Sequence, residues 1–117
     1  MKISEIAEIL NAEVCCAAEH ADAEVFSAFA SDMMSDVLAY VKEQSILISG
    51  LCNPQTIRTA VMLDMKCVVL VRGKTPTADM LSLAVRNNIV VLATKNKMYP
   101  TCGILYEKGI IAGEYSL

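Results

Sequence analysis

The chain has 117 residues, of which 55% are hydrophobic and 20% charged, so it carries enough apolar surface for a core and is not a disordered chain. Its formal net charge of −3 argues against a general nucleic-acid binder, because contact with phosphates requires a basic surface. The apolar runs are too short to cross a bilayer, and we expect a single domain over residues 1–117 with no membrane span.

The first third of the chain predicts a helix and two strands. Residues 3–10 place apolar side chains at helical spacing among charged ones, unlike a signal peptide, so we expect a cytoplasmic protein. Residues 12–16 predict a short strand, and residues 25–30 predict a better one because they include β-branched and aromatic side chains. A helix then begins at Ser31 or Ser35.

The middle of the chain is more regular. Residues 45–51 predict a buried strand, and residues 67–71 predict another that is buried on both faces. Between them, Asn53 is the expected N-cap and Pro54 the first residue of a helix that ends near residue 65.

The last third continues the alternation. We expect a helix over residues 76–88 with Thr75 as its cap, a strand over residues 89–94, and a helix over residues 100–108 that ends at Gly109. Three continuous apolar strands separated by helices predict right-handed crossovers and a parallel sheet covered on both faces. The predicted fold is therefore an α/β three-layer α/β/α sandwich with a mostly parallel sheet, to which the less regular first part adds an antiparallel or edge strand.

Candidate binding residues follow the three predicted parallel strands, because open α/β sheets bind ligands beyond the carboxyl ends of their strands. This rule selects Ser49, Gly50 and Asn53 after the first strand, Arg72, Gly73, Lys74 and Thr75 after the second, and Thr94 and Lys95 after the third.

The segment VVLVRGKTPTADML joins a strand, a glycine turn, two cations and a helix start. A helix N-terminus favours anions, Gly73 allows close approach of the backbone, and Arg72 and Lys74 add charge, so this turn is a candidate phosphate or carboxylate site. Turn chemistry alone also explains Gly73, Thr75 and Pro76, and from the residues alone we prefer that interpretation. It leaves Arg72 and Lys74 unexplained.

A second polar segment, ASDMMSD, contains Ser31, Asp32, Ser35 and Asp36. Two carboxylates here could hold a metal ion, but serine and aspartate are also the ordinary residues of a helix start, which is the interpretation we prefer. We therefore predict no metal site.

The five cysteines are odd in number and form no CxxC pair, and the chain has only one histidine that could complete a metal site with them. This pattern supports neither a zinc site nor a disulfide framework, and the cysteines are expected to be reduced thiols. No nucleophile is paired with a base by a recognised motif, so we predict no catalytic residues and no cofactor.

The segments SEIAEILNAEV, ASDMMSDVLAYVK, VVLVRGKTP and IVVLAT resemble DRTGG-domain proteins, a family that is also similar to the N-terminal domain of HPr kinase/phosphorylase. The resemblance covers residues 1–106. It implies an α/β fold like that of the HPr kinase N-terminal domain and a non-catalytic accessory role, since larger relatives attach this domain to phosphotransacetylase, to CBS-domain pyrophosphatases or to a kinase. Where the family shows Thr-Gly-Gly before the proline, this chain has Val71, Arg72 and Gly73, so Arg72 is expected to alter or block the approach of a ligand.

Two functional hypotheses follow. The first is a stand-alone regulatory module that senses a small anionic metabolite or nucleotide and associates as a homodimer. Its ligand-binding residues would be Ser31, Asp32, Asn53, Arg72, Gly73, Lys74, Thr75 and Thr94. The alternative is an interaction module without a small ligand, which uses exposed methionine and tyrosine side chains such as Tyr99 and Tyr106 to dimerise or to dock on a partner enzyme. An enzyme is the least supported function, with Asp32 and Asp36 as its candidate residues.

Overall fold

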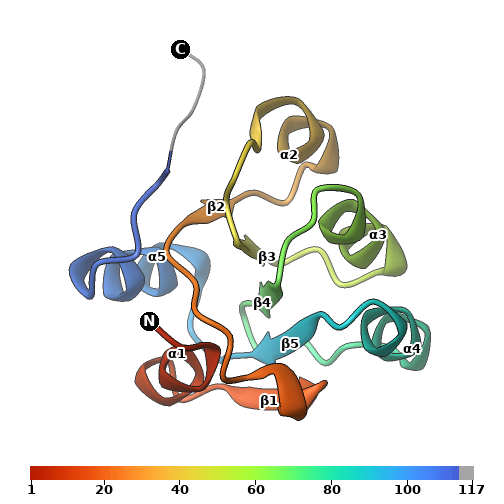
Figure 1. The fold of residues 1–117 in the computed structure, drawn as a ribbon, viewed down its shortest axis with the longest axis horizontal. Coiled ribbons are helices and arrows are strands. Elements are labelled where there is room, and N and C mark those ends of the chain that lie inside the picture. The colour runs from red at the N-terminus through yellow and green to blue at the C-terminus, as the bar shows by residue number, and fades with distance from the viewer. Residues whose placement is uncertain (114–117) are drawn as a thin grey trace.

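A computed structural model of the chain describes residues 1–113, which form one five-stranded sheet. Helices lie on both faces of this sheet (Figure 1). The strand order is β1-β5-β4-β3-β2. The strands are β1 (Glu13–Cys16), β2 (Ala28–Ala30), β3 (Ile46–Ser49), β4 (Cys67–Leu70) and β5 (Val90–Ala93). The helices are α1 (Ile3–Ile9), α2 (Met34–Tyr40), α3 (Pro54–Met62), α4 (Ala78–Arg86) and α5 (Met98–Glu107), with a 3-10 turn η1 at Ala18–His20.

The layers confirm the predicted α/β/α sandwich. Helices α2, α3 and α4 cover one face of the sheet, and α1 and α5 cover the other (Figure 1). Strands β2 to β5 are parallel, whereas β1 pairs with β5 in the antiparallel sense at the edge of the sheet. The expected antiparallel edge strand is thus present, and it comes from the first part of the chain.

Each central strand supplies both layers of the core because successive side chains point to opposite faces. In β4, Val68 and Leu70 pack with the cluster under α2, α3 and α4, whereas Cys67 and Val69 pack with the cluster under α1 and α5. All four side chains are buried. This two-sided burial is why the parallel strands read as unbroken apolar runs.

The strand predicted over residues 25–30 is shorter in the structure and spans only Ala28–Ala30. Val25 instead donates its N–H to the carbonyl of Met1 at 2.8 Å, and Ser27 forms a bridge with Ile111 near the other end of the described chain. Val25 and Ser27 therefore pair with residues near the two ends of the described chain, while the Ser27 carbonyl also accepts from the Ile46 N–H of β3 at 3.1 Å.

Helix α2, predicted to begin at Ser31 or Ser35, begins at Met34, one residue before Ser35, and Met33 occupies the N-cap position. The Ser31 hydroxyl accepts a hydrogen bond from the Met33 N–H at 3.0 Å, and the Ser31 N–H donates to the carbonyl of Ile48 at 3.0 Å. Ser31 thus extends the pairing of β2 with β3 and shapes the turn that precedes the helix.

The predicted cap of α4 at Thr75 is also wrong. The helix begins at Ala78, and the Thr77 hydroxyl accepts a hydrogen bond from the Met80 N–H at 3.2 Å. Thr75 and Thr77 are both suitable capping residues, and Thr77 is the one whose hydroxyl lies at the first turn. The predicted cap at Asn53 is confirmed, because its side chain accepts from the Gln55 N–H at 2.8 Å.

Helix α5 begins two residues earlier than predicted, so Pro100 lies inside the first turn. N–H groups in the first turn have no partner within the helix, so the missing N–H of proline costs no hydrogen bond there. The predicted end at Gly109 is confirmed: this glycine follows the C-cap and has φ of +98°. Within residues 1–113, no helix has the length and apolar character needed to cross a bilayer.

Candidate functional site

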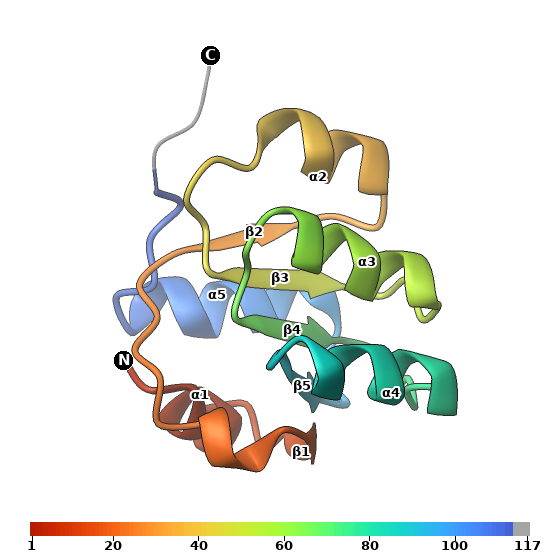
Figure 2. The same ribbon diagram turned by 45° about the vertical axis from the view of Figure 1, so that its right-hand side comes forward.

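The turns that follow β2, β3, β4 and β5 share one edge of the sheet, because these strands run in the same direction (Figure 2). This arrangement confirms the predicted common edge. It brings Asp32, Gly50, Arg72 and Thr94 to the carboxyl ends of four neighbouring strands. The polar groups at these carboxyl ends form two sets. One lies at the ends of β2, β3 and β4, and the other lies at the ends of β4 and β5.

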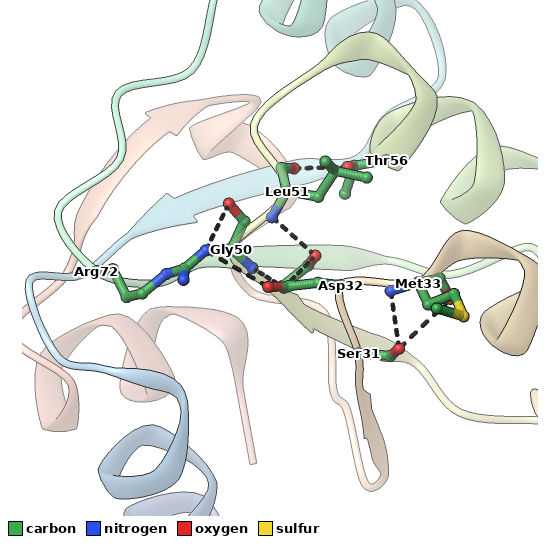
Figure 3. A network of polar contacts seen from close by, with 8 residues as sticks. Ser31, Asp32, Met33, Gly50, Leu51, Thr56 and Arg72 are labelled. Carbon is green, nitrogen blue, oxygen red and sulfur yellow. Dashed lines mark hydrogen bonds and ion pairs between the residues drawn. The ribbon is translucent and has the colours of Figure 1, made fainter.

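The first set is a clamp formed by Asp32, Gly50 and Arg72 (Figure 3). One carboxylate oxygen of Asp32 accepts hydrogen bonds from the Gly50 N–H at 2.6 Å and from the Ser49 hydroxyl at 3.2 Å. The guanidinium of Arg72 donates to the other oxygen of Asp32 at 3.4 Å and to the Gly50 carbonyl at 3.3 Å. The clamp therefore joins the ends of β2, β3 and β4.

The clamp depends on the backbone at two positions. A Cβ atom on Gly50 would collide with the guanidinium of Arg72, so the absence of a side chain makes room for the arginine. Arg72 itself has φ of +67°, in the left-handed region that non-glycine residues rarely adopt, and Gly73 follows with φ of +70°. These two residues turn the chain sharply, and the Arg72 side chain reaches back over β3.

The second set lines a cavity of about 370 Å³, which we call the strand-end cavity. It lies between the C-terminal end of α1, the start of β1 and the turns that follow β4 and β5. Its lining residues are Ile9, Leu10, Asn11, Glu13, Gly73, Lys74, Thr75, Ala93, Thr94, Lys95 and Asn96.

The walls of the strand-end cavity are held by hydrogen bonds between its loops. The N–H groups of Arg72 and Gly73 donate to the carbonyls of Asn96 and Thr94 at 2.8 and 3.0 Å. The buried Thr94 hydroxyl donates to the carbonyl of Leu10 at 2.9 Å and accepts from the Asn96 N–H at 3.2 Å. Thr94 thus fastens the end of α1 to the turn after β5.

Three backbone donors at this cavity remain without a partner. Within residues 1–113, no hydrogen bond uses the N–H of Lys74, Thr75 or Lys95. The side chains of Lys74 and Lys95 are exposed. The wall formed by the β4–α4 and β5–α5 turns therefore presents two ammonium groups together with unpaired N–H groups, which is the chemistry that binds anions.

The structure separates the residues that sequence reasoning grouped together. Gly73, Lys74, Thr75 and Thr94 line the strand-end cavity, whereas Asp32 and Arg72 bind each other in the clamp. The side chains of Ser31 and Asn53 take part in the turns before α2 and α3. A ligand role for each of these eight residues stays a prediction.

Sequence reasoning missed Asn11, Glu13 and Asn96 as lining residues of the cavity. Glu13 belongs to β1, which joins the sheet beside β5 through the antiparallel pairing of Glu13 with Ala93. No sequence signal tied residue 13 to residue 93, because the pairing of an edge strand is a tertiary contact. Asn11 has φ of +49°, a conformation that asparagine adopts more readily than most residues. An asparagine just before a short strand was the only local sign in the sequence of a turn at this position.

Four of the five cysteines show no sign of activation. All five are free thiols, and burial raises the pKa of Cys15 to about 11 and also raises the pKa values of Cys16, Cys67 and Cys102. These four thiols stay protonated at neutral pH, and the protonated thiol is a poor nucleophile. Among residues 1–113, no group of three or more His, Cys, Asp or Glu side chains is placed so that it could hold a metal ion.

Comparison with known proteins identifies the fold and the family of the chain. The CBS and DRTGG domains of the regulatory region of Clostridium perfringens pyrophosphatase, solved in complex with the activator diadenosine tetraphosphate, share the fold with a TM-score of 0.73 at 18% identity. The match covers 98% of this chain and 50% of that one, so this chain spans about half the length of its structural neighbour. No curated protein matches the sequence. The DRTGG domain matches residues 5–107, nearly the whole chain, and the protein therefore belongs to the DRTGG domain family.

Proposed function

We propose that this protein is a non-catalytic regulatory module that binds a small anionic metabolite or nucleotide in the strand-end cavity. The observation that carries the proposal is the wall on which Lys74 and Lys95 lie beside three backbone N–H groups that have no partner among residues 1–113. Gly73, which has no Cβ, leaves this wall open to a ligand. The volume of about 370 Å³ is in the range of roughly 300 to 1,000 Å³ that is typical of small-ligand sites.

The clamp changes the role expected of Arg72. Its guanidinium is held by Asp32 and Gly50, so in this proposal the charge that attracts the anion comes from Lys74 and Lys95. The clamp residues, together with Ser31 and Asn53, would contact only a ligand long enough to extend from the cavity along the edge of the sheet. Arg72 then limits how far the cavity opens toward β3, as expected for an arginine in place of a family glycine.

A regulatory role is supported by family membership and by the structural neighbour. That neighbour is the regulatory region of a pyrophosphatase in complex with a nucleotide activator, although its likeness at 18% identity supports the fold rather than a shared ligand. Asp32, the carboxylate first considered for catalysis, is bound to Arg72 and two further donors instead of to a reactive group. We propose that the module acts as one cytoplasmic domain without a cofactor.

The test is a thermal-shift and calorimetric titration with inorganic phosphate, pyrophosphate and nucleotides. A ligand that binds only the native state raises the melting temperature in a concentration-dependent way. The double variant Lys74→Gln/Lys95→Gln should abolish the shift. Lys66→Gln/Lys108→Gln, which removes the same charge near the opposite edge of the sheet, should retain it. If none of these anions raises the melting temperature of the wild type at millimolar concentration, the anion-binding proposal is wrong.

An interaction module is the second candidate, and the outer face of α5 favours it. Tyr99 is 91% exposed and Tyr106 is 69% exposed, and they lie on the same side of the helix with Gly103 between them. A Cβ atom on Gly103 would meet nothing within 4 Å, so the monomer gives no packing reason for a glycine that weakens the helix. A glycine at this place suits the close approach of another helix.

A second copy of the chain is the partner that fits this face. If two α5 helices cross in antiparallel fashion with Gly103 near the two-fold axis, Tyr99 lies against Tyr106 of the partner subunit. Glu107 then lies near the N-terminus of the other α5, where unpaired N–H groups and Lys97 favour a carboxylate. We propose that the regulatory module dimerises through this face, which leaves the strand-end cavity open.

A further inference from the structure

Glu13 places a negative charge in a cavity that otherwise attracts anions. It is the first residue of β1, its backbone pairs with Ala93, and its exposed side chain lines the strand-end cavity with Lys74 and Lys95. No ion pair joins Glu13 to either lysine in the described part of the chain. The carboxylate is therefore free to interact with a bound molecule.

A carboxylate can only accept hydrogen bonds, and it repels a neighbouring anion. For a bare inorganic anion, Glu13 would thus oppose the attraction of Lys74 and Lys95. For a ligand that carries hydroxyl groups next to its phosphate, the same carboxylate is a hydrogen-bond acceptor for those hydroxyls. Acidic side chains bind ribose hydroxyls in this way at other strand-end sites.

The size and remaining lining of the cavity point to the same class of ligand. Its volume of about 370 Å³ is in the range of roughly 300 to 1,000 Å³ of small-ligand sites and exceeds what an inorganic phosphate fills. The amides of Asn11 and Asn96 can both donate and accept, and Ile9 and Ala93 add apolar surface. Mixed lining of this kind suits a sugar ring better than a fully charged ion.

We propose that Glu13 is a specificity-determining residue that selects a phosphorylated sugar, either free or as part of a nucleotide, over inorganic phosphate. The phosphate would lie against Lys74, Lys95 and the free N–H groups, and the sugar hydroxyls would donate to the Glu13 carboxylate. This inference rests on the proposed anion site. It adds that Glu13 recognises the uncharged sugar of the ligand.

Isothermal titration of the wild type and of Glu13→Gln with three probes tests the inference: ribose 5-phosphate, AMP and inorganic phosphate. Glutamine keeps the size of the side chain and the backbone pairing of β1, so the fold is retained. We expect Glu13→Gln to weaken binding of ribose 5-phosphate and AMP about tenfold and to strengthen binding of phosphate several-fold. Equal effects on the first two probes would assign the selectivity to the sugar, and a larger effect on AMP would mean that the base contributes.

The control variant Glu43→Gln removes the same charge near the opposite edge of the sheet and should change none of the three affinities. If Glu13→Gln strengthens binding of all three probes alike, Glu13 acts only by repulsion, and the inference is overturned while the anion site stands. If no probe binds the wild type, the proposed function and the inference fail together. Opposite changes for sugar phosphates and for phosphate are the outcome that supports the inference.

Discussion

The guanidinium of Arg72 donates a hydrogen bond to the carbonyl of Gly50 at 3.3 Å and lies in space that a Cβ atom on Gly50 would occupy. The two residues are 22 positions apart in the sequence and follow neighbouring parallel strands. Gly50 thus leaves room for the Arg72 side chain because it has no Cβ atom. The guanidinium then covers the carboxyl end of β3.

This relationship predicts coupling between the two positions. Gly50→Ala should displace the guanidinium and lower the free energy of unfolding by up to about 1 kcal/mol, since the Arg72–Asp32 ion pair is half exposed and such pairs contribute little. The same substitution in an Arg72→Ala background should cost less, because the collision is gone. Urea denaturation of the two single variants and the double variant measures the coupling. Strict additivity would contradict the clamp.

Asp32 and Asp36 should differ in their effect on stability although both belong to the same ASDMMSD segment. Asp32→Ala removes the acceptor of the Gly50 N–H and the Ser49 hydroxyl, and should cost about 1–3 kcal/mol. Asp36→Ala removes a first-turn acidic residue of α2, and should cost about 0.5 kcal/mol through the helix dipole. Chemical denaturation compares them, and equal costs would show that the Asp32 contacts do not stabilise the fold.

Gly103 inside α5 and Gly109 just after its C-cap should respond in opposite ways to substitution by alanine. Gly103→Ala should raise the free energy of unfolding by about 0.5–1 kcal/mol, because the position is helical and its Cβ would meet open space. Gly109→Ala should lower it by about 1 kcal/mol, because φ of +98° is strained for any residue with a side chain. Thermal unfolding at low protein concentration, where association does not contribute, gives both values. Stabilisation by both variants would contradict the C-terminal cap.

The exposed tyrosines of α5 should carry self-association. Tyr99→Ser/Tyr106→Ser should raise the dimer dissociation constant at least about tenfold, since buried aromatic side chains dominate interface energies. Tyr40→Ser on the opposite helical layer, where Tyr40 is 49% exposed, is the matched control and should leave the constant unchanged. Sedimentation equilibrium measures all three proteins. A wild type that stays monomeric at high concentration would remove the basis for this interface.

Much of the fold could be predicted from the sequence because its signals are local. The apolar runs of β3, β4 and β5 predicted the central parallel strands. The Asn53–Pro54 pair predicted the start of α3, and Gly109 predicted the end of α5. Where two residues of similar chemistry lie close together, local reasoning chose wrongly, as with Thr75 in place of Thr77. The segments that resemble the DRTGG domain led to the family that the comparison confirms.

The sequence by itself determined the layers, the central strands and the edge of the sheet at which polar residues gather, because these follow from periodic burial and from the shared direction of parallel strands. Only the tertiary structure decided that Arg72 binds Asp32 and that Glu13 faces the same cavity as Lys74 and Lys95. The reason is physical: these contacts depend on a left-handed turn at Arg72 and on the antiparallel pairing of an edge strand, and neither leaves a repeating pattern in the sequence.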